Sequence, residues 1–432
     1  MITPARASDL PRLAPPAYQG IAGEVVGKLA PVTEADPVAL LVTLLAAAGA
    51  AIGDGPHVLI GGSAHPARIW PLIIGRTGSG RKGESWAQTE RILTAIEPSF
   101  VRENITTGLS TGEGLIAAFR DHEDAEGKIK SRDKRLLIVE AEFGRTLGVT
   151  RREGNTLSAV LRTLWESGRA AVLTKSEPLR CRDAHLVVVA HITPGELLLK
   201  LSEADVSGGL VNRFVPVLAG RPHLLADDAD MPDLNAIELK RRISAARKHG
   251  RLRRNAEAAV LWKSAYEAMS EDEEDGPLGE ILARGPAYSM RLALIYALLD
   301  GASEIGVTHL RSGLAVWDYV AATSRRVFAQ RSGRNDLDRL ADYLADGHGG
   351  RTRTEIRNLF GRNRSAESID GLVAELERRG DAQQEEDRSG RGRPVVRTYW
   401  TGTARTSLSS LLQEDAINAE TLNAGQDGGL NA

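Results

Sequence analysis

The segment from residue 69 to residue 96 constrains the fold most strongly, because it predicts a strand, a glycine-rich loop and a helix in succession. After an apolar run it contains three glycines and two basic residues, namely Gly75, Gly78, Gly80, Arg81 and Lys82. Glycines let backbone N–H groups turn towards an anion, a lysine adds a positive charge, and a following helix adds its positive N-terminus. The segment therefore predicts a phosphate-binding loop.

The loop departs from the strict P-loop pattern. Counted from Gly75, the pattern puts Arg81 at its lysine position and Lys82 at its Ser/Thr position. One inserted residue instead makes Lys82 the phosphate-binding lysine. Gly83 then follows it, and Ser85 or the neighbouring glutamate is left to approach a metal ion. The alternative is a glycine-rich turn that binds nothing.

A second apolar run, residues 136–139, ends in the carboxylates Glu140 and Glu142. This pattern is typical of a buried parallel strand whose carboxyl end reaches a site. We expect Glu140 to hold Mg²⁺, and Glu142 is the candidate for the base that polarises the attacking water. The alternative is a buried strand that ends in solvated acids.

Two further apolar runs follow, at residues 184–190 and 215–218. The first leads into His191 and Thr193, either of which is a candidate sensor of a γ-phosphate; a strand-end histidine satisfied within its own fold is the alternative. Arg213 precedes the second run. It suits an arginine finger delivered to the nucleotide of a neighbouring subunit, or it holds a loop.

In order and spacing these motifs resemble the helicase-like, RecA-type P-loop ATPases of the primase-associated family, found in phages, plasmids and integrated elements. The resemblance covers about residues 15–330. It implies ATP and Mg²⁺ as cofactors, DNA as a partner, a homo-oligomeric ring with a hexamer among the expected sizes, and a separate primase-polymerase. It also implies a second sensor at Arg291. Gly83 and Glu140 depart from the family pattern.

The chain after residue 335 predicts a winged helix-turn-helix. Thr352 and Glu355 form a capping box, a helix follows at 366–379, and two strand-like segments flank a basic tip. The helix carries several acids, so we expect DNA phosphates to be bound by flanking arginines, with a protein-binding wing as the alternative. These arginines are Arg353, Arg357, Arg362, Arg364, Arg388, Arg391 and Arg393.

A basic cluster of arginines and a lysine occupies residues 241–254, and an acidic run follows it at 271–275. Such runs are more often solvated helix surface and loop than a nucleic-acid site, and contact with phosphate is the alternative. Basic and acidic residues nearly balance, 55 against 57, so any nucleic-acid surface has to be local. The single cysteine, Cys181, excludes a disulfide framework. With no signal-peptide pattern at residues 1–10, we expect a cytoplasmic protein without a membrane span.

The predicted fold is α/β, with a RecA-like P-loop core, a helical domain and a small winged helix. The predicted domains are an N-terminal helical segment (1–70), the ATPase core (71–222), the helical domain (223–334), the winged helix (335–401) and a disordered tail (402–432). The leading function is a DNA-associated, helicase-like ATPase in mobile-element replication. The alternative is a DNA-binding regulator or adaptor whose P-loop senses nucleotide without hydrolysing it. A small-molecule kinase is disfavoured, because a winged helix would have no role in it.

Overall fold

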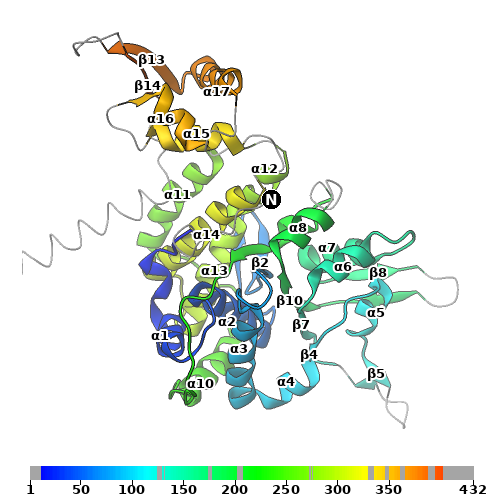
Figure 1. Cartoon of the computed structure of the whole chain (residues 1–432). Coiled ribbons are helices and arrows are strands. Elements are labelled where there is room, and N and C mark those ends of the chain that lie inside the picture. Colours follow the sequence, from blue (N-terminus) through cyan, green and yellow to red (C-terminus); the bar gives the residue numbers. More distant parts are fainter. Residues whose placement is uncertain are drawn as a thin grey trace, which may run out of the picture. The chain divides into compact units, whose positions relative to one another are not determined.

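The structure is a computed structural model that describes residues 11–123, 129–130, 132–173, 178–201, 208–271, 274, 276–328, 335–345, 350–360, 365–387 and 395–401. The described residues divide into two compact units, whose boundary falls between Ser324 and Arg325. The boundary lies within helix α14 (Val307–Phe328). Both units combine helices with a β-sheet (Figure 1).

A five-stranded parallel sheet forms the centre of the first unit, in the order β11-β3-β10-β7-β4. Its strands are β3 (Pro71–Ile74), β4 (Ile105–Thr106), β7 (Arg135–Glu140), β10 (His185–Ile192) and β11 (Val215–Leu218). All eight residues of β10 are buried, as expected for a central strand covered on both faces. The parallel sheet flanked by helices confirms the predicted α/β class and is compatible with a RecA-like core.

Helix α2 (Pro37–Ile52) lies between the sheet and the surrounding helices, and it packs against β10, β7, α3 and α13. Asp36 caps it as predicted: one carboxylate oxygen accepts from Val38 N (2.9 Å) and Ala39 N (3.4 Å). The other oxygen accepts from Gly220 N (3.0 Å), just after β11. The cap therefore also ties α2 to the edge of the sheet where β11 ends.

The remaining helices of the first unit surround this core (Figure 1). They are α1 (Gly20–Leu29), α3 (Lys82–Ile96), α4 (Pro98–Asn104), α5 (Gly112–Ala117), α6 (Phe143–Thr150), α7 (Leu157–Ser167), α8 (Pro194–Lys200), α10 (Ala236–Ala246), α11 (Ala256–Glu271), α12 (Gly276–Leu282) and α13 (Gly285–Leu299). Short antiparallel pairs are formed by β1 (His57–Ile60) with β2 (Ser63–Pro66), β5 (His122–Glu123) with β6 (Ile129–Lys130), and β8 (Ala170–Val172) with β9 (Leu179–Cys181). Among the described helices, none has the length and apolar composition needed to cross a membrane.

After the end of α14, the described residues of the second unit form three helices and a three-stranded antiparallel sheet in the order β12-β14-β13. Its elements after α14 are α15 (Asn335–Ala345), β12 (Arg351–Thr352), α16 (Arg353–Leu359), α17 (Ala366–Arg379), β13 (Ala382–Asp387) and β14 (Val395–Trp400). Leucine, isoleucine and phenylalanine side chains from the three helices form a small core. The predicted capping box of Thr352 and Glu355 is confirmed, and Gly380 ends α17 with a φ of 78°.

Candidate functional site

The glycine-rich loop joins β3 to α3 at the carboxyl edge of the parallel sheet. Gly75 N donates to Ile192 O at the end of β10 (3.1 Å), so the loop leaves β3 beside that strand. Residues 76–79 form its exposed tip. The chain then returns at Gly80, whose N–H donates to Arg76 O (2.9 Å). The loop is therefore anchored at its base and open to solvent at its tip.

Two of the glycines are required by this conformation. Gly78 has a φ of 72°, in the left-handed region that favours glycine. A Cβ at Gly80 would lie 2.7 Å from the backbone nitrogen and oxygen of Arg76, so a side chain there would force the loop to open. The glycine pattern thus specifies the closed shape of the loop.

Lys82 is the first residue of α3, and its side chain folds back over the loop. Its Nζ donates to Gly75 O (2.5 Å). Partial burial lowers the pKa of Lys82, while the carboxylate of Glu196 counteracts this effect. Arg81 has a positive φ of 42° and points away from the loop, where it pairs with Glu34 (2.5 Å). The geometry therefore favours Lys82 over Arg81 as the cation of the loop.

The first turn of α3 also favours an anion. Arg81, the residue before the helix, provides no side-chain cap. The first amides of a helix have no acceptor within the helix, and they need a capping side chain, water or a ligand. Together with the partial positive charge of a helix of 15 residues, these amides make the loop a site for a negatively charged group.

His191 lies on β10, between the strand that precedes the loop and the strand that ends in Glu140. It pairs with Ile73 of β3, one residue beyond the pair of Ala190 with Glu140. Its side chain is 3% exposed, and Nε2 is buried without a hydrogen-bond partner. Burial lowers the pKa of His191 to about 4, and the nearby Lys82 ammonium contributes to the shift. His191 is therefore a neutral imidazole with an unused nitrogen close to Lys82.

Two residues next to the loop, Glu196 and Glu34, have roles that the sequence did not lead us to expect. Thr193 Oγ1 accepts from Glu196 N (3.2 Å), and Glu196 Oε2 accepts in return from Thr193 N (3.5 Å), so the pair forms a capping box at α8. The Thr-x-x-Glu spacing was the signal for it. Glu34 was missed as well. It pairs with Arg81 and accepts from Leu225 N (3.0 Å), which lowers the pKa of Glu34.

The carboxylates at the end of β7 differ in environment. Glu140 is 3% exposed; its Oε1 accepts from Gly108 N (2.6 Å) and Leu109 N (2.7 Å), and its Oε2 accepts from Thr146 Oγ1 (2.9 Å). Glu140 therefore holds the loop after β4 against β7, a structural role that the sequence did not indicate. Glu142 is exposed, directly before α6.

The predicted magnesium ligands do not form a free set of oxygens. Three hydrogen bonds occupy the Glu140 carboxylate, Gly83 has no hydroxyl, and the buried Ser85 Oγ donates to Lys82 O (2.8 Å). Within the described part of the chain, no cluster of three or more His, Cys, Asp or Glu residues is suited to a metal ion. The loop thus fits a phosphate group better than it fits a metal ion held by protein ligands.

Arg213 and Arg291 lie at the opposite edge of the sheet from the loop. Arg213 precedes β11, is 8% exposed, and donates to Gly209 O and to Glu166 Oε1 (2.7 Å) of its own chain. This geometry matches the loop-holding alternative and not an arginine projecting towards a neighbour. Arg291 donates to Arg68 O (3.1 Å), just before β3, and stacks on Trp165 at 4.2 Å from its ring centroid. The structure does not bring Arg291 to the glycine-rich loop.

Two of the arginines expected to contact DNA lie among the described residues of the second unit. Arg353 forms an exposed ion pair with Asp370 of α17, and Arg357 is exposed on α16. Asp370, one of the acids of α17, therefore neutralises the charge of Arg353. The other predicted contacts lie outside the described residues; they are Arg362, Arg364, Arg388, Arg391 and Arg393.

Comparison with known proteins adds no family to these observations. No protein-family model matches the chain, and no curated protein matches it. The fold and the site define a mixed α/β protein that presents a glycine-rich loop, a lysine and a neutral buried histidine at the carboxyl edge of a parallel sheet.

Proposed function

We propose that the protein binds ATP at the β3–α3 loop and hydrolyses it as a DNA-associated, helicase-like ATPase in the replication of a mobile element. One observation carries the proposal: the buried Nε2 of His191 has no hydrogen-bond partner and lies near Lys82, beside a glycine-rich loop that opens a helix. Buried polar atoms in proteins normally have partners, so an unused one next to a cation suggests a ligand.

The proposal gives each residue of this edge a role. Lys82 leaves Gly75 O and binds the β- and γ-phosphates, while the first amides of α3 bind phosphate oxygens. His191 donates from Nε2 to the γ-phosphate and reports its presence. Glu142, the exposed carboxylate at the end of β7, orients the attacking water. No protein ligand is assigned to Mg²⁺, because Glu140 and Ser85 are engaged elsewhere.

The second unit supports the DNA part of the proposal. Its three helices and antiparallel sheet are compatible with a winged helix, and Arg357 lies exposed on its surface. A ring-shaped oligomer and a separate primase-polymerase are expectations from the resemblance alone. The ion pair of Arg213 with Glu166 gives no support to an arginine finger between subunits.

The hydrogen bonding of Glu140 and the presence of Gly83 favour a second function. An adaptor that senses nucleotide without hydrolysing it needs the phosphate loop but no metal-binding acid. The three hydrogen bonds at Glu140 and the absence of a hydroxyl at Gly83 agree with such a switch.

The test is ATP turnover by the purified protein with and without single-stranded DNA, beside Lys82→Ala. Arg91→Ala, which removes an exposed cation of the same helix, is the matched control. Turnover that DNA stimulates and that Lys82→Ala alone abolishes supports the ATPase. ATP binding without turnover supports the adaptor. A protein that binds no nucleotide contradicts both.

A further inference from the structure

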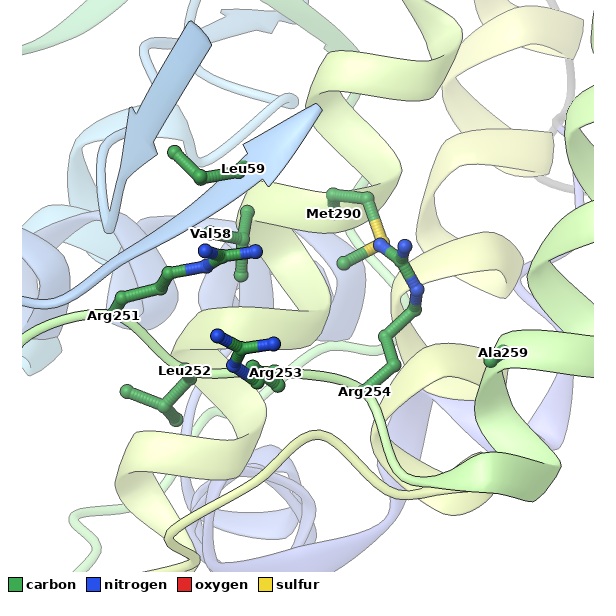
Figure 2. Close-up of a pocket in the computed structure, with 8 residues that line it drawn as sticks. All are labelled: Val58, Leu59, Arg251, Leu252, Arg253, Arg254, Ala259 and Met290. Carbon is green, nitrogen blue, oxygen red and sulfur yellow. The ribbon is translucent and has the colours of Figure 1, made fainter. Parts of the chain in front are cut away.

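An open pocket on the first unit is lined by three arginines from one short segment. It lies between β1, residues 251–254, and helices α11 and α13. Figure 2 shows the guanidinium groups of Arg251, Arg253 and Arg254 around the pocket, with Val58 and Met290 forming apolar wall. Three guanidinium groups therefore concentrate positive charge around one pocket.

The backbone of this segment is fixed by its neighbours on both sides. Leu252 N donates to His57 O of β1 (2.8 Å), and Ile305 N donates to Arg253 O (2.8 Å). The Leu252 side chain is buried and anchors the segment in the core. The arginines therefore project from a rigid, extended stretch of chain, which favours a preorganised binding site.

Arg254 is the most constrained of the three. Its guanidinium lies 5.5 Å from the ring centroid of Trp262 and 3.7 Å from Met290 Sδ, and its Nε is buried without a hydrogen-bond partner. Burial lowers the pKa of Arg254, and the nearby charge of Arg251 lowers it further. Two like charges thus face each other where solvent screens them only in part.

Other arginines of the same basic cluster are neutralised by carboxylates. Arg241 and Arg242 both bind Glu238 at 2.6 Å, and Arg247 binds Glu97 at 2.9 Å. The described residues offer no such ion pair to the three arginines of the pocket. Ion pairs with carboxylates therefore account for Arg241, Arg242 and Arg247 and leave the arginines of the pocket unexplained.

We propose that Arg251, Arg253 and Arg254 form an anion site that binds a phosphate group. A guanidinium fork binds phosphate oxygens with two parallel hydrogen bonds, and a bound phosphate would neutralise the facing charges. Met290 and Val58 give such a ligand an apolar surface beside the charge. The phosphate belongs either to a small phosphorylated ligand or to a nucleic-acid backbone.

This site is independent of the proposed nucleotide loop. Met290 precedes Arg291 on α13, and Arg291 binds the carbonyl of Arg68, before the amino end of β3. The glycine-rich loop follows the carboxyl end of the same strand. The pocket and the loop share no residue, so either anion site can exist without the other.

The test uses the full-length chain carrying Lys82→Ala, which silences the loop. Calorimetry measures binding of inorganic pyrophosphate, and fluorescence anisotropy measures binding of a labelled single-stranded oligonucleotide. The test variant adds Arg251→Gln and Arg253→Gln, two exposed positions whose change leaves the core intact. The control variant instead adds Arg102→Gln and Arg241→Gln, which removes two exposed guanidinium groups that have carboxylate partners.

We expect the pocket variant to bind at least one probe more weakly by roughly tenfold or more, about 1.4 kcal/mol, and the control variant to bind it as the parent does. Loss of pyrophosphate binding identifies a small phosphorylated ligand. Loss of oligonucleotide binding alone identifies a nucleic-acid backbone. Equal binding by the pocket and control variants, or no binding of either probe by the parent, overturns the proposal.

Discussion

Replacing Lys82 and Arg81 separately decides which of the two adjacent cations binds phosphate. The strict P-loop count assigns Arg81, whereas the folded loop directs Lys82 over Gly75 and pairs Arg81 with Glu34. We expect Lys82→Ala to weaken ATP binding strongly and Arg81→Ala to change it little. Both substitutions remove one positive charge, so each controls for the other.

The expected magnitude follows from the contacts. A charge-assisted hydrogen bond to phosphate contributes about 1.5–3 kcal/mol, which corresponds to a loss of roughly 10-fold to 150-fold in affinity for Lys82→Ala. Arg81 is partly exposed in a surface ion pair, and such pairs contribute about 0–1 kcal/mol to stability. The charge of Arg81 is directed towards Glu34 and not over the loop, so its loss should change the affinity for ATP by less than about fivefold.

The assay is calorimetric titration of each variant with ATP, with thermal unfolding to show that both variants are folded. Among the described contacts, the Lys82 side chain makes one hydrogen bond within the protein, to Gly75 O. The variant should therefore still fold. An equal or larger loss in Arg81→Ala would refute the assignment of Lys82 and restore the strict pattern.

Three further outcomes test other parts of the account. Glu140→Gln should lower the free energy of unfolding by about 1–3 kcal/mol in urea, because an amide replaces a carboxylate that accepts three hydrogen bonds; an unchanged midpoint would contradict its structural role. Arg213→Ala should lower stability by a similar amount in the same assay and leave ATP binding intact; lost turnover at full stability would instead restore the arginine finger. Burial lowers the pKa of His65 and His191 to about 4 and holds that of His185 well below its usual value. Their stabilisation is therefore present above about pH 6.5 and is lost as the pH falls towards 4, by up to roughly 1.4 kcal/mol per pH unit for each histidine. Thermal unfolding across this range should show a shallower slope in His191→Gln, and an equal slope would argue against a buried neutral imidazole.

Much of the fold was predictable because its signals are local. Asp36 before Pro37 predicts the start of α2, and the four apolar residues 215–218 coincide with β11. The Thr352 capping box and the glycine at 380 define α16 and the end of α17. These features depend on hydrogen bonds and backbone angles within a few residues, so they can be recognised from a single sequence.

The site was less predictable because its contacts join distant segments. Two of the three hydrogen bonds of Glu140 come from residues 31 and 32 positions earlier, and their existence depends on β4 lying next to β7. The ion pair of Arg213 is made with Glu166, which lies 47 positions earlier in the chain. No sequence pattern predicts the hydrogen bonds of Glu140 or the ion pair between Arg213 and Glu166. The proximity of His191 to Lys82 was expected only in outline, since the strand order decides it.

The most direct test of the account is a crystal structure of the protein with a non-hydrolysable ATP analogue. We expect phosphates at the β3–α3 loop, with Lys82 Nζ moved from Gly75 O to a phosphate oxygen and His191 Nε2 hydrogen-bonded to the γ-phosphate. An analogue bound elsewhere, or a loop that binds phosphate while His191 Nε2 stays without a partner, would contradict it.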